Sequence, residues 1–248
     1  MISKFFVTIV EINAKIENNK IIPEMSVKKI RDMVMDSKIV VLKQVFKKDE
    51  LLFFRKKLID WGKTKPPIVP SKQKDQSYLF KNHHRIDDNP VQSETPHKCH
   101  FYNLIQPEML PDSFSHVVKT FFELMKNFQN ELAETNVTFF SENSSSFFRP
   151  QVIQYPSGGG FFAEHKHTIE PQRIGLIAGL SKYGVDFQNG GTTFVTPEGL
   201  EDSELNNDIG DITLFRIDLL RAVSPVDSDE SIDWNSDKGR WTMVLPYY

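Results

Sequence analysis

The stretch PQVIQYPSGGGFFAEHKH, residues 150–167, sets the character of the C-terminal part of this 248-residue chain. Two short apolar and aromatic runs lie on either side of a Pro-Ser-Gly-Gly-Gly segment, which is typical of two strands joined by a turn. The same texture continues to the end, where further short runs alternate with Gly, Pro, Asn and Asp: 173–180, 192–195, 211–216, 220–223 and 241–246. Evenly spaced short strands predict a β-sandwich or barrel over residues 147–248.

Residues 1–146 have a different pattern, and we expect them to support this barrel within a single domain of residues 1–248. Apolar residues at helical spacing predict three helices, and β-branched or aromatic runs predict two strands. The helices are expected after Ser26, over Lys48–Trp61 with Gly62 as the stop, and from the N-cap Ser113 to near Ala133; the strands are expected over 5–12 and 38–43. The segment 63–111 is rich in Pro, Lys, Gln, Asn and His, so we predict a long loop that covers the core.

Composition limits the classes of partner and compartment. The formal net charge is −3, which gives no electrostatic reason to expect nucleic acid or an anionic membrane as partner. The early apolar run Phe5–Val10 is too short to span a bilayer and lacks a cleavage pattern. The single cysteine, Cys99, excludes an internal disulfide and a multi-thiolate zinc site. We therefore expect a cytoplasmic protein.

The motif His165-Lys166-His167 is the main candidate for chemistry. Side chains alternate between the faces of a strand, so the two imidazoles are expected to point together into the barrel as half of a metal site. The alternative is a pair of polar residues hydrogen-bonded in a pocket. Two other histidine groups, His83-His84 and His97-Lys-Cys-His100, lie in the predicted loop, where isolated histidines are more often surface residues than ligands.

An ordered series of short motifs resembles one known family. The series comprises Gln151–Tyr155, Gly158–Gly160, His165-x-His167, Leu180-Ser181, Gly190-Gly-Thr192, Gly210-Asp211, Phe215, Val223-Ser-Pro-Val226 and Arg240-x-Thr242. It resembles the 2-oxoglutarate/Fe(II) oxygenases, most closely their prolyl-hydroxylase-like branch, from about residue 147 to the end. The resemblance implies a double-stranded β-helix, a jelly-roll or cupin-like barrel with N-terminal helical support in an α+β chain that is mainly β. It also implies Fe(II) and 2-oxoglutarate as cofactors.

The resemblance places the metal ligands, and this sequence departs from them at two positions. In the family, iron is held by a His, a carboxylate two residues later and a distal His. His165 occupies the first position and His167 the second, where a neutral imidazole replaces an anionic ligand. Arg221 occupies the distal position, and a guanidinium cannot ligate a cation. Arg221 therefore marks either a lapsed site or a positive charge that binds an anion directly. A third ligand would have to come from another residue, for which the candidates are Glu170, Asp218, His97 and His100.

The other half of the family's site is present in this sequence. Arg240-Trp-Thr242 matches the Arg-x-Ser/Thr pair that binds the distal carboxylate of 2-oxoglutarate in these oxygenases, and Tyr155 could add a hydroxyl. Without the resemblance, Arg240 would be read as a surface arginine at the start of a strand.

Three functions remain open at this point. The leading hypothesis is a 2-oxoglutarate-dependent oxygenase that hydroxylates or otherwise oxidises a small molecule or peptide side chain. The first alternative is a non-catalytic or metal-free relative that binds an anionic ligand or supports a partner subunit, for which Arg221 argues. The second is a cupin-like metalloenzyme in which Glu170 faces His165 and His167. The sequence leaves the substrate and the oligomeric state open.

Overall fold

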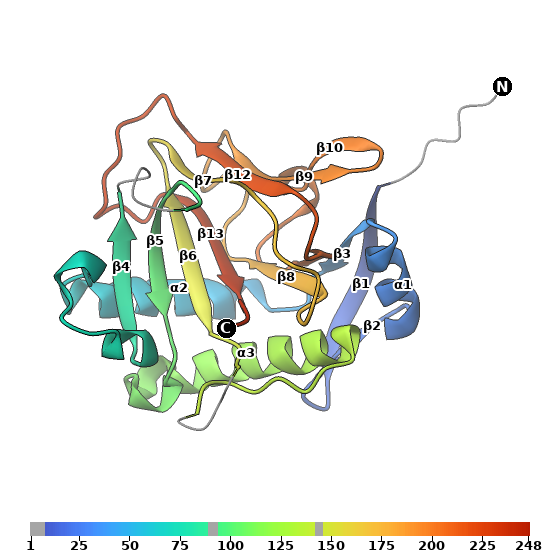
Figure 1. Ribbon diagram of the computed structural model, residues 1–248, viewed down its shortest axis with the longest axis horizontal. Coiled ribbons are helices and arrows are strands. Elements are labelled where there is room, and N and C mark those ends of the chain that lie inside the picture. The colour runs from blue at the N-terminus through green and yellow to red at the C-terminus, as the bar shows by residue number, and fades with distance from the viewer. Residues whose placement is uncertain (1–7, 89–93, 142–145) are drawn as a thin grey trace.

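The computed structural model describes residues 8–88, 94–141 and 146–248, and strands dominate it (Figure 1). The strands are β1 Ile9–Glu17, β2 Lys20–Pro23, β3 Ile39–Lys43, β4 His83–Asp87, β5 His97–Asn103, β6 Gln151–Pro156, β7 Gly160–His165, β8 Ile174–Gly179, β9 Gly191–Thr196, β10 Gly199–Asp202, β11 Ile212–Arg216, β12 Arg221–Val226 and β13 Gly239–Val244. The α-helices are α1 Val27–Met35, α2 Lys48–Lys63 and α3 Asp112–Ala133. Short 3-10 turns are η1 Pro70–Lys72, η2 Ser77–Phe80, η4 Pro107–Met109 and η5 Glu204–Asn206.

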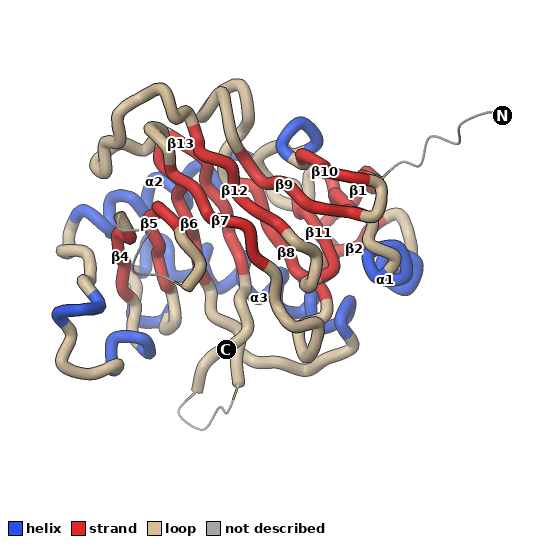
Figure 2. Tube along the Cα trace, turned by 45° about the horizontal axis from the view of Figure 1, so that its top comes forward, coloured by secondary structure: helices blue, strands red, loops and turns tan. Residues whose placement is uncertain are grey.

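The strands follow the order β10-β9-β12-β7-β5-β6-β13-β8-β11-β3-β1-β2, with β4 on β5. Strand β5 pairs with β7 through its first residues and with β6 through its later ones, so the sheet bends there into two faces. The smaller face is β10-β9-β12-β7 and the larger is β6-β13-β8-β11-β3-β1-β2 (Figure 2). This arrangement is a double-stranded β-helix, so the predicted fold is confirmed.

Alternation of side chains along the larger face separates the core from the cavity. On β13, Trp241 and Met243 are buried in the main hydrophobic cluster, whereas Arg240 and Thr242 line a cavity between the two faces. The main cluster joins one side of this face to the apolar sides of α2 and α3, including Phe54 of α2. The helices thus cover the outer side of the larger face, whereas Tyr155 of β6 and Arg240 and Thr242 of β13 point inward.

The N-terminal half forms part of the same sheet. Strand β3 pairs with β11 and β1 lies parallel to β3, so residues of the predicted N-terminal strand extend the larger face. The described strand begins at Ile9 and continues to Glu17, whereas residues 5–7 of the prediction lie outside the described residues. Among the described helices, none is long and apolar enough to cross a membrane.

The predicted long loop over residues 63–111 is wrong in part, because it contains β4 and β5. These strands have histidines where a core strand normally has aliphatic residues. The imidazoles are buried because they hydrogen-bond one another or neighbouring groups, so the alternation of polar and apolar residues that identifies a strand is absent.

The predicted helix ends differ from the observed ones by a few residues. Ser26 caps α1 and accepts a hydrogen bond from Lys29 N, as the cap preference of serine favours. Helix α2 continues through Gly62, which does not stop it. A Cβ at this glycine would lie 2.8 Å from Tyr102 Cε1, so close packing explains the glycine. Helix α3 begins at Asp112, which places Ser113 inside its first turn.

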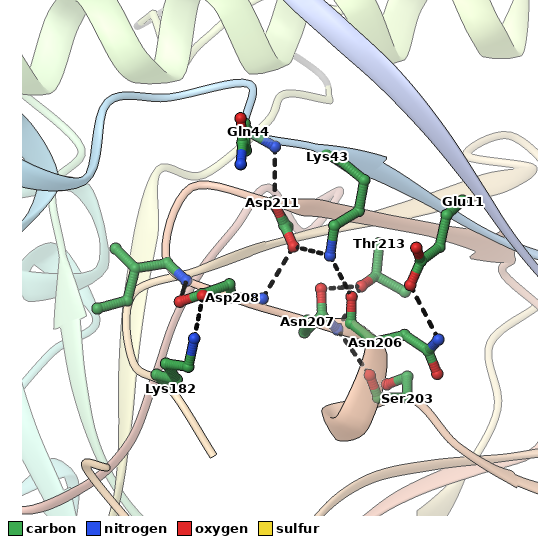
Figure 3. A network of polar contacts seen from close by, with 11 residues as sticks. Glu11, Lys43, Gln44, Lys182, Ser203, Asn206, Asn207, Asp208, Asp211 and Thr213 are labelled. Atoms are coloured by element: carbon green, nitrogen blue, oxygen red, sulfur yellow. Dashed lines mark hydrogen bonds and ion pairs between the residues drawn. The ribbon is translucent and has the colours of Figure 1, made fainter. Parts of the chain in front are cut away.

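A buried aspartate ties the N-terminal strands to the barrel (Figure 3). The Asp211 carboxylate accepts hydrogen bonds from Gln44 N at 2.7 Å and Asp208 N at 2.9 Å. It also forms an ion pair with Lys43 Nζ at 2.5 Å, and its side chain is fully buried. Lys43 Nζ also donates to Asn206 O at 2.6 Å, and the neighbouring Asn207 forms hydrogen bonds with Thr213 on β11. A buried carboxylate is stable only with such partners, so this cluster fixes β3 against β11.

We predict that Asp211→Ala lowers the free energy of unfolding by about 2–4 kcal/mol, because it removes these hydrogen bonds and the carboxylate that pairs with Lys43. Urea denaturation of the variant measures the change. The exposed Asp229→Ala serves as control and should change stability by less than about 0.5 kcal/mol. Equal stability of the two variants would contradict this role for Asp211.

Candidate functional site

A cavity of about 260 Å³ lies between the two faces of the sheet. The six residues that the resemblance assigns to the metal, distal and carboxylate-binding positions line this cavity, namely Tyr155, His165, His167, Arg221, Arg240 and Thr242. The predicted site residues are therefore brought together, although they come from four different segments of the chain.

The two histidines of the motif are not equivalent. Strand β7 ends at His165, so His167 lies beyond the strand and is exposed, although it still lines the cavity. The expectation that both project from one strand is therefore wrong, because the chain leaves the sheet between them. Their ring centroids are 5.5 Å apart with the planes nearly perpendicular.

The tautomer of His165 follows from its backbone contact. His165 Nδ1 lies 2.8 Å from Ala163 O, and a carbonyl oxygen accepts, so Nδ1 carries the proton and Nε2 has a lone pair available. Burial, followed by the positive charge of Arg221, lowers the pKa of His165 to about 4. The ring is therefore neutral at physiological pH, which is the state that accepts a hydrogen bond or ligates a metal.

Arg221 occupies the distal position opposite His165. The two residues are register partners on β12 and β7. Arg221 Nη1 donates to Ile217 O at 2.9 Å and to Leu219 O at 3.3 Å, and its guanidinium carbon lies 4.9 Å from the centroid of the Phe215 ring. The residue is 8% exposed, and no carboxylate of the described residues forms an ion pair with it. Burial lowers its pKa to about 10, so the side chain remains a cation at neutral pH.

The candidates for a third metal ligand do not complete a site. His97 lines the cavity, but its Nδ1 contacts Thr95 O and its Nε2 contacts Asp87 Oδ2, each at 2.8 Å. The side chain of Glu170 is 69% exposed and pairs with Arg173. Glu170 does not line the cavity, so it does not face His165 and His167 as the cupin-like alternative predicts.

The two remaining candidates are also engaged elsewhere. Asp218 accepts a hydrogen bond from Arg216 Nε at 2.6 Å and does not line the cavity. His100 lies on the other side of the sheet, against His84. Within residues 8–88, 94–141 and 146–248, no group of three His, Cys, Asp or Glu side chains could hold a metal. The donor set therefore does not fit the iron of a facial triad.

The carboxylate half of the predicted site is well formed. Arg240 Nε donates to Glu204 Oε1 at 2.6 Å in a buried ion pair, and Glu204 also accepts from Thr192 N. The pair fixes the guanidinium while its two terminal nitrogens make no hydrogen bond to the described residues. Thr242 lies on the same side of β13, and the Arg240 guanidinium carbon is 5.6 Å from the centroid of the Tyr155 ring. Burial, then nearby Cys99, raises the pKa of Tyr155, so its hydroxyl is available as a donor.

Comparison with known proteins defines the fold. No family model matches the sequence, and no curated protein matches it. A prolyl-4-hydroxylase from Pseudomonas putida has a TM-score of 0.51 at 12% identity, covering 88% of this chain and 97% of that chain. A 2OG-Fe(II) oxygenase-family oxidoreductase from Burkholderia pseudomallei also has a TM-score of 0.51 at 12% identity, covering 95% and 94%. SnoN, the non-heme alpha ketoglutarate dependent epimerase of nogalamycin biosynthesis, has a TM-score of 0.54 at 10% identity, covering 90% and 82%.

The chain has the fold of the 2-oxoglutarate/Fe(II) oxygenases. At 10–12% identity the likeness defines the architecture and carries no residue roles. Within this fold, Arg240, Thr242 and Tyr155 of the chain line the cavity. It places a second arginine where the resemblance implies a metal ligand.

Sequence reasoning missed several residues of the site. Glu204, which positions Arg240, lies in a 3-10 turn with no motif around it. Arg85 lines the cavity from β4, pairs with Asp87 at 3.1 Å and stacks over Phe101. Arg85 could have been identified if β4 and β5 had been recognised as strands, because side chains along a strand alternate between its two sides.

The histidines of the predicted loop are buried and hydrogen-bonded within the fold. His83 contacts Lys81 O and Asn103, and His84 Nδ1 lies 2.8 Å from His100 Nε2. Burial, followed by the proximity of His84, lowers the pKa of His100 to about 3. An unfolded histidine binds a proton near pH 6.5, so the unfolded state holds more protons than the folded state between about pH 6.5 and pH 3.

We therefore predict that stability falls as the pH is lowered from 7 to 4, and that His100→Phe loses stability less steeply. A single histidine of this kind contributes a slope of up to about 1.4 kcal/mol per pH unit. Chemical denaturation at a series of pH values measures both slopes. Equal slopes for the variant and the unmodified chain would contradict the neutral, buried state of His100.

Proposed function

We propose that the protein binds a small dicarboxylate of the 2-oxoglutarate class in this cavity without a resident iron. One carboxylate contacts Arg240, Thr242 and Tyr155, and the other acidic end contacts Arg221. The buried Arg221 cation without a carboxylate partner is the observation that carries the proposal, because a desolvated charge is unfavourable unless an anion pairs with it.

The charges around the cavity support an anionic ligand. Arg85, Arg221 and Arg240 all line it, and no Asp or Glu of the described part of the chain does. Planar guanidinium groups suit carboxylates because they donate two parallel hydrogen bonds. Tyr155 lines the cavity together with Arg221 and Arg240, and its ring centroid lies 5.6 Å from the guanidinium carbon of Arg240. The two arginines therefore act on one continuous space.

The size of the cavity supports a small ligand. Its volume of about 260 Å³ lies just below the range of about 300–1,000 Å³ that is usual for small-molecule sites. A five-carbon dicarboxylate is more compatible with this space than a peptide. His165 Nε2 could accept a hydrogen bond from a hydroxyl or protonated acid of the ligand, since its lone pair has no contact with the backbone.

Oxygenase activity remains the second candidate, and His165 with His167 is the observation that favours it. Two imidazoles reach the cavity next to the proposed dicarboxylate site. Turnover would require a third ligand that the described residues do not supply. The conversion of 2-oxoglutarate to succinate in the presence of Fe(II) and oxygen tests this candidate separately from binding.

The binding proposal predicts that 2-oxoglutarate binds with the same affinity whether or not EDTA is present. 2-Oxovalerate, which has the same chain length but lacks the second carboxylate, should bind at least about tenfold more weakly, because a charge-assisted contact stabilises by about 1.5–3 kcal/mol. Isothermal titration calorimetry measures both. Binding of 2-oxoglutarate that requires added Fe(II) would contradict a metal-independent site.

Variants assign the two ends of the ligand. Arg221→Gln should weaken 2-oxoglutarate binding at least about tenfold while folding is retained, because it removes an unpaired cation and not an ion pair. Thr242→Val should weaken binding by a smaller factor. Arg216→Gln is the control, since Arg216 pairs with Asp218 and does not line the cavity. Unchanged affinity in Arg221→Gln would reject the role of Arg221.

A further inference from the structure

Arg149 is another buried arginine without an acidic partner, and the proposed dicarboxylate does not contact it. The residue is 6% exposed, and no Asp or Glu side chain of the described residues forms an ion pair with it. Its backbone N donates to Pro246 O at 3.0 Å, and its guanidinium carbon lies 3.6 Å from the centroid of the Tyr248 ring. Pro246 and Tyr248 both line the cavity between the two faces of the sheet, here called the main cavity. Arg149 therefore lies at the edge of the main cavity.

The register of the strands separates Arg149 from the dicarboxylate site. Tyr155 of β6 is the register partner of Arg240 on β13. Gln151 lies four residues before Tyr155 on β6, a separation of about 13 Å at the rise of an extended strand, and Arg149 precedes Gln151. A five-carbon dicarboxylate held by Arg240 therefore does not reach Arg149, which lies toward the other end of β6.

The atoms of Arg149 that a ligand can contact are its two terminal nitrogens. Its Nε is enclosed and has no hydrogen-bond partner, so a ligand does not reach that atom. Nη1 and Nη2 also form no hydrogen bond with a described residue, but they are not among the enclosed atoms without a partner. Both terminal nitrogens therefore have accessible surface. A guanidinium donates two parallel hydrogen bonds to a carboxylate, which makes this group the natural ligand for them.

The ring of Tyr248 offsets only part of the cost of burying this cation. Burial lowers the pKa of Arg149, although an arginine still remains protonated at neutral pH. A cation–π contact stabilises by less than the removal of an unpaired charge from water costs. An anion bound to Nη1 and Nη2 supplies the counter-charge that the described residues do not provide.

The lining next to Arg149 favours an acid with an apolar body. Val244, Leu245, Tyr247 and Tyr248 all line the main cavity, and Tyr248 is 49% exposed, so part of its surface is open to a ligand. Arg85 adds positive charge to the same cavity, and no Asp or Glu of the described residues lines it. A carboxylate attached to a flat ring matches both the charge and the aromatic side chains of this lining.

We propose that this end of the main cavity binds an aromatic monocarboxylate. Its carboxylate accepts hydrogen bonds from Nη1 and Nη2 of Arg149, and its ring packs against Tyr248, Tyr247 and Val244. The site is additional to the dicarboxylate site and does not depend on it, because none of these contacts involves Arg240, Thr242 or Arg221.

A matched pair of probes tests the charge requirement. Fluorine NMR follows the titration of the full chain with 4-fluorobenzoate, which is anionic at neutral pH, and with 4-fluorobenzamide, a neutral molecule of nearly the same shape. We expect saturable binding of 4-fluorobenzoate and binding of 4-fluorobenzamide that is at least about tenfold weaker, because the charge-assisted hydrogen bonds are lost. Equal affinity for the two probes, or no saturable binding of 4-fluorobenzoate, would overturn the proposal.

Two variants assign this preference to Arg149. Arg149→Gln should abolish the preference for 4-fluorobenzoate, whereas Arg149→Lys, which keeps the charge but not the planar pair of donors, should retain part of it. Arg216→Gln is the control and should retain the full preference, since Arg216 pairs with Asp218 and does not line the cavity. A preference that Arg149→Gln leaves intact would place the acid elsewhere and contradict the assignment.

A crystal structure of the unmodified chain with 4-bromobenzoate tests the same contact without relying on the folding of a variant. The carboxylate should lie within about 3.2 Å of Nη1 or Nη2 of Arg149, and a carboxylate bound to Arg240 or Arg221 instead would overturn the proposal. The affinity of Arg149→Gln for 2-oxoglutarate separates the two sites. It should equal that of the unmodified chain, and a loss as large as that of 4-fluorobenzoate would show that both acids share one site.

Discussion

The positive charge of Arg221 is the constraint on which the chemistry of the main cavity depends. The side chain is held by two backbone carbonyls and the Phe215 ring, and it lies opposite His165. A guanidinium in this position repels a cation and attracts an anion. The histidines beside it are neutral, so they do not compete with it for a negatively charged ligand.

The fold directs a second arginine, Arg240, toward the same cavity. Alternation along β13 directs Arg240 and Thr242 toward the cavity and Trp241 toward the helices, so one strand contributes both to the site and to the core. The ion pair with Glu204 fixes Arg240 without occupying its terminal nitrogens. A preorganised arginine loses little conformational freedom on binding, which favours affinity for a small ligand.

Much of this arrangement could be predicted from the sequence. Short strands separated by turn residues predicted the barrel, and the motif around Arg240 predicted a side chain that lines the cavity. The sequence could not show that β7 ends at His165 and leaves His167 exposed, because a strand end depends on pairing with β12. Nor could it identify β4 and β5, whose buried histidines depend on hydrogen bonds between strands far apart in the chain.

The same limit applies to the residues that assist the site. Glu204 has no local signal, since its role depends on the approach of a 3-10 turn to β13. The candidate third ligands were close in sequence to plausible positions, but Asp218 and His97 are engaged by other side chains. Of the four candidate third ligands only His97 lines the cavity, so position in the sequence predicted neither which of them reach the cavity nor which atoms remain available there.

The central claim is that Arg221 replaces a metal ligand and makes the cavity a site for an anion alone. Anaerobic titration of the metal-stripped protein with Fe(II), followed by desalting and iron analysis, tests this claim most directly, with Arg221→His measured in parallel. We predict background iron in the unmodified chain and a gain of bound iron in Arg221→His, because a third imidazole then joins His165 and His167. One tightly bound iron per unmodified chain would contradict the account.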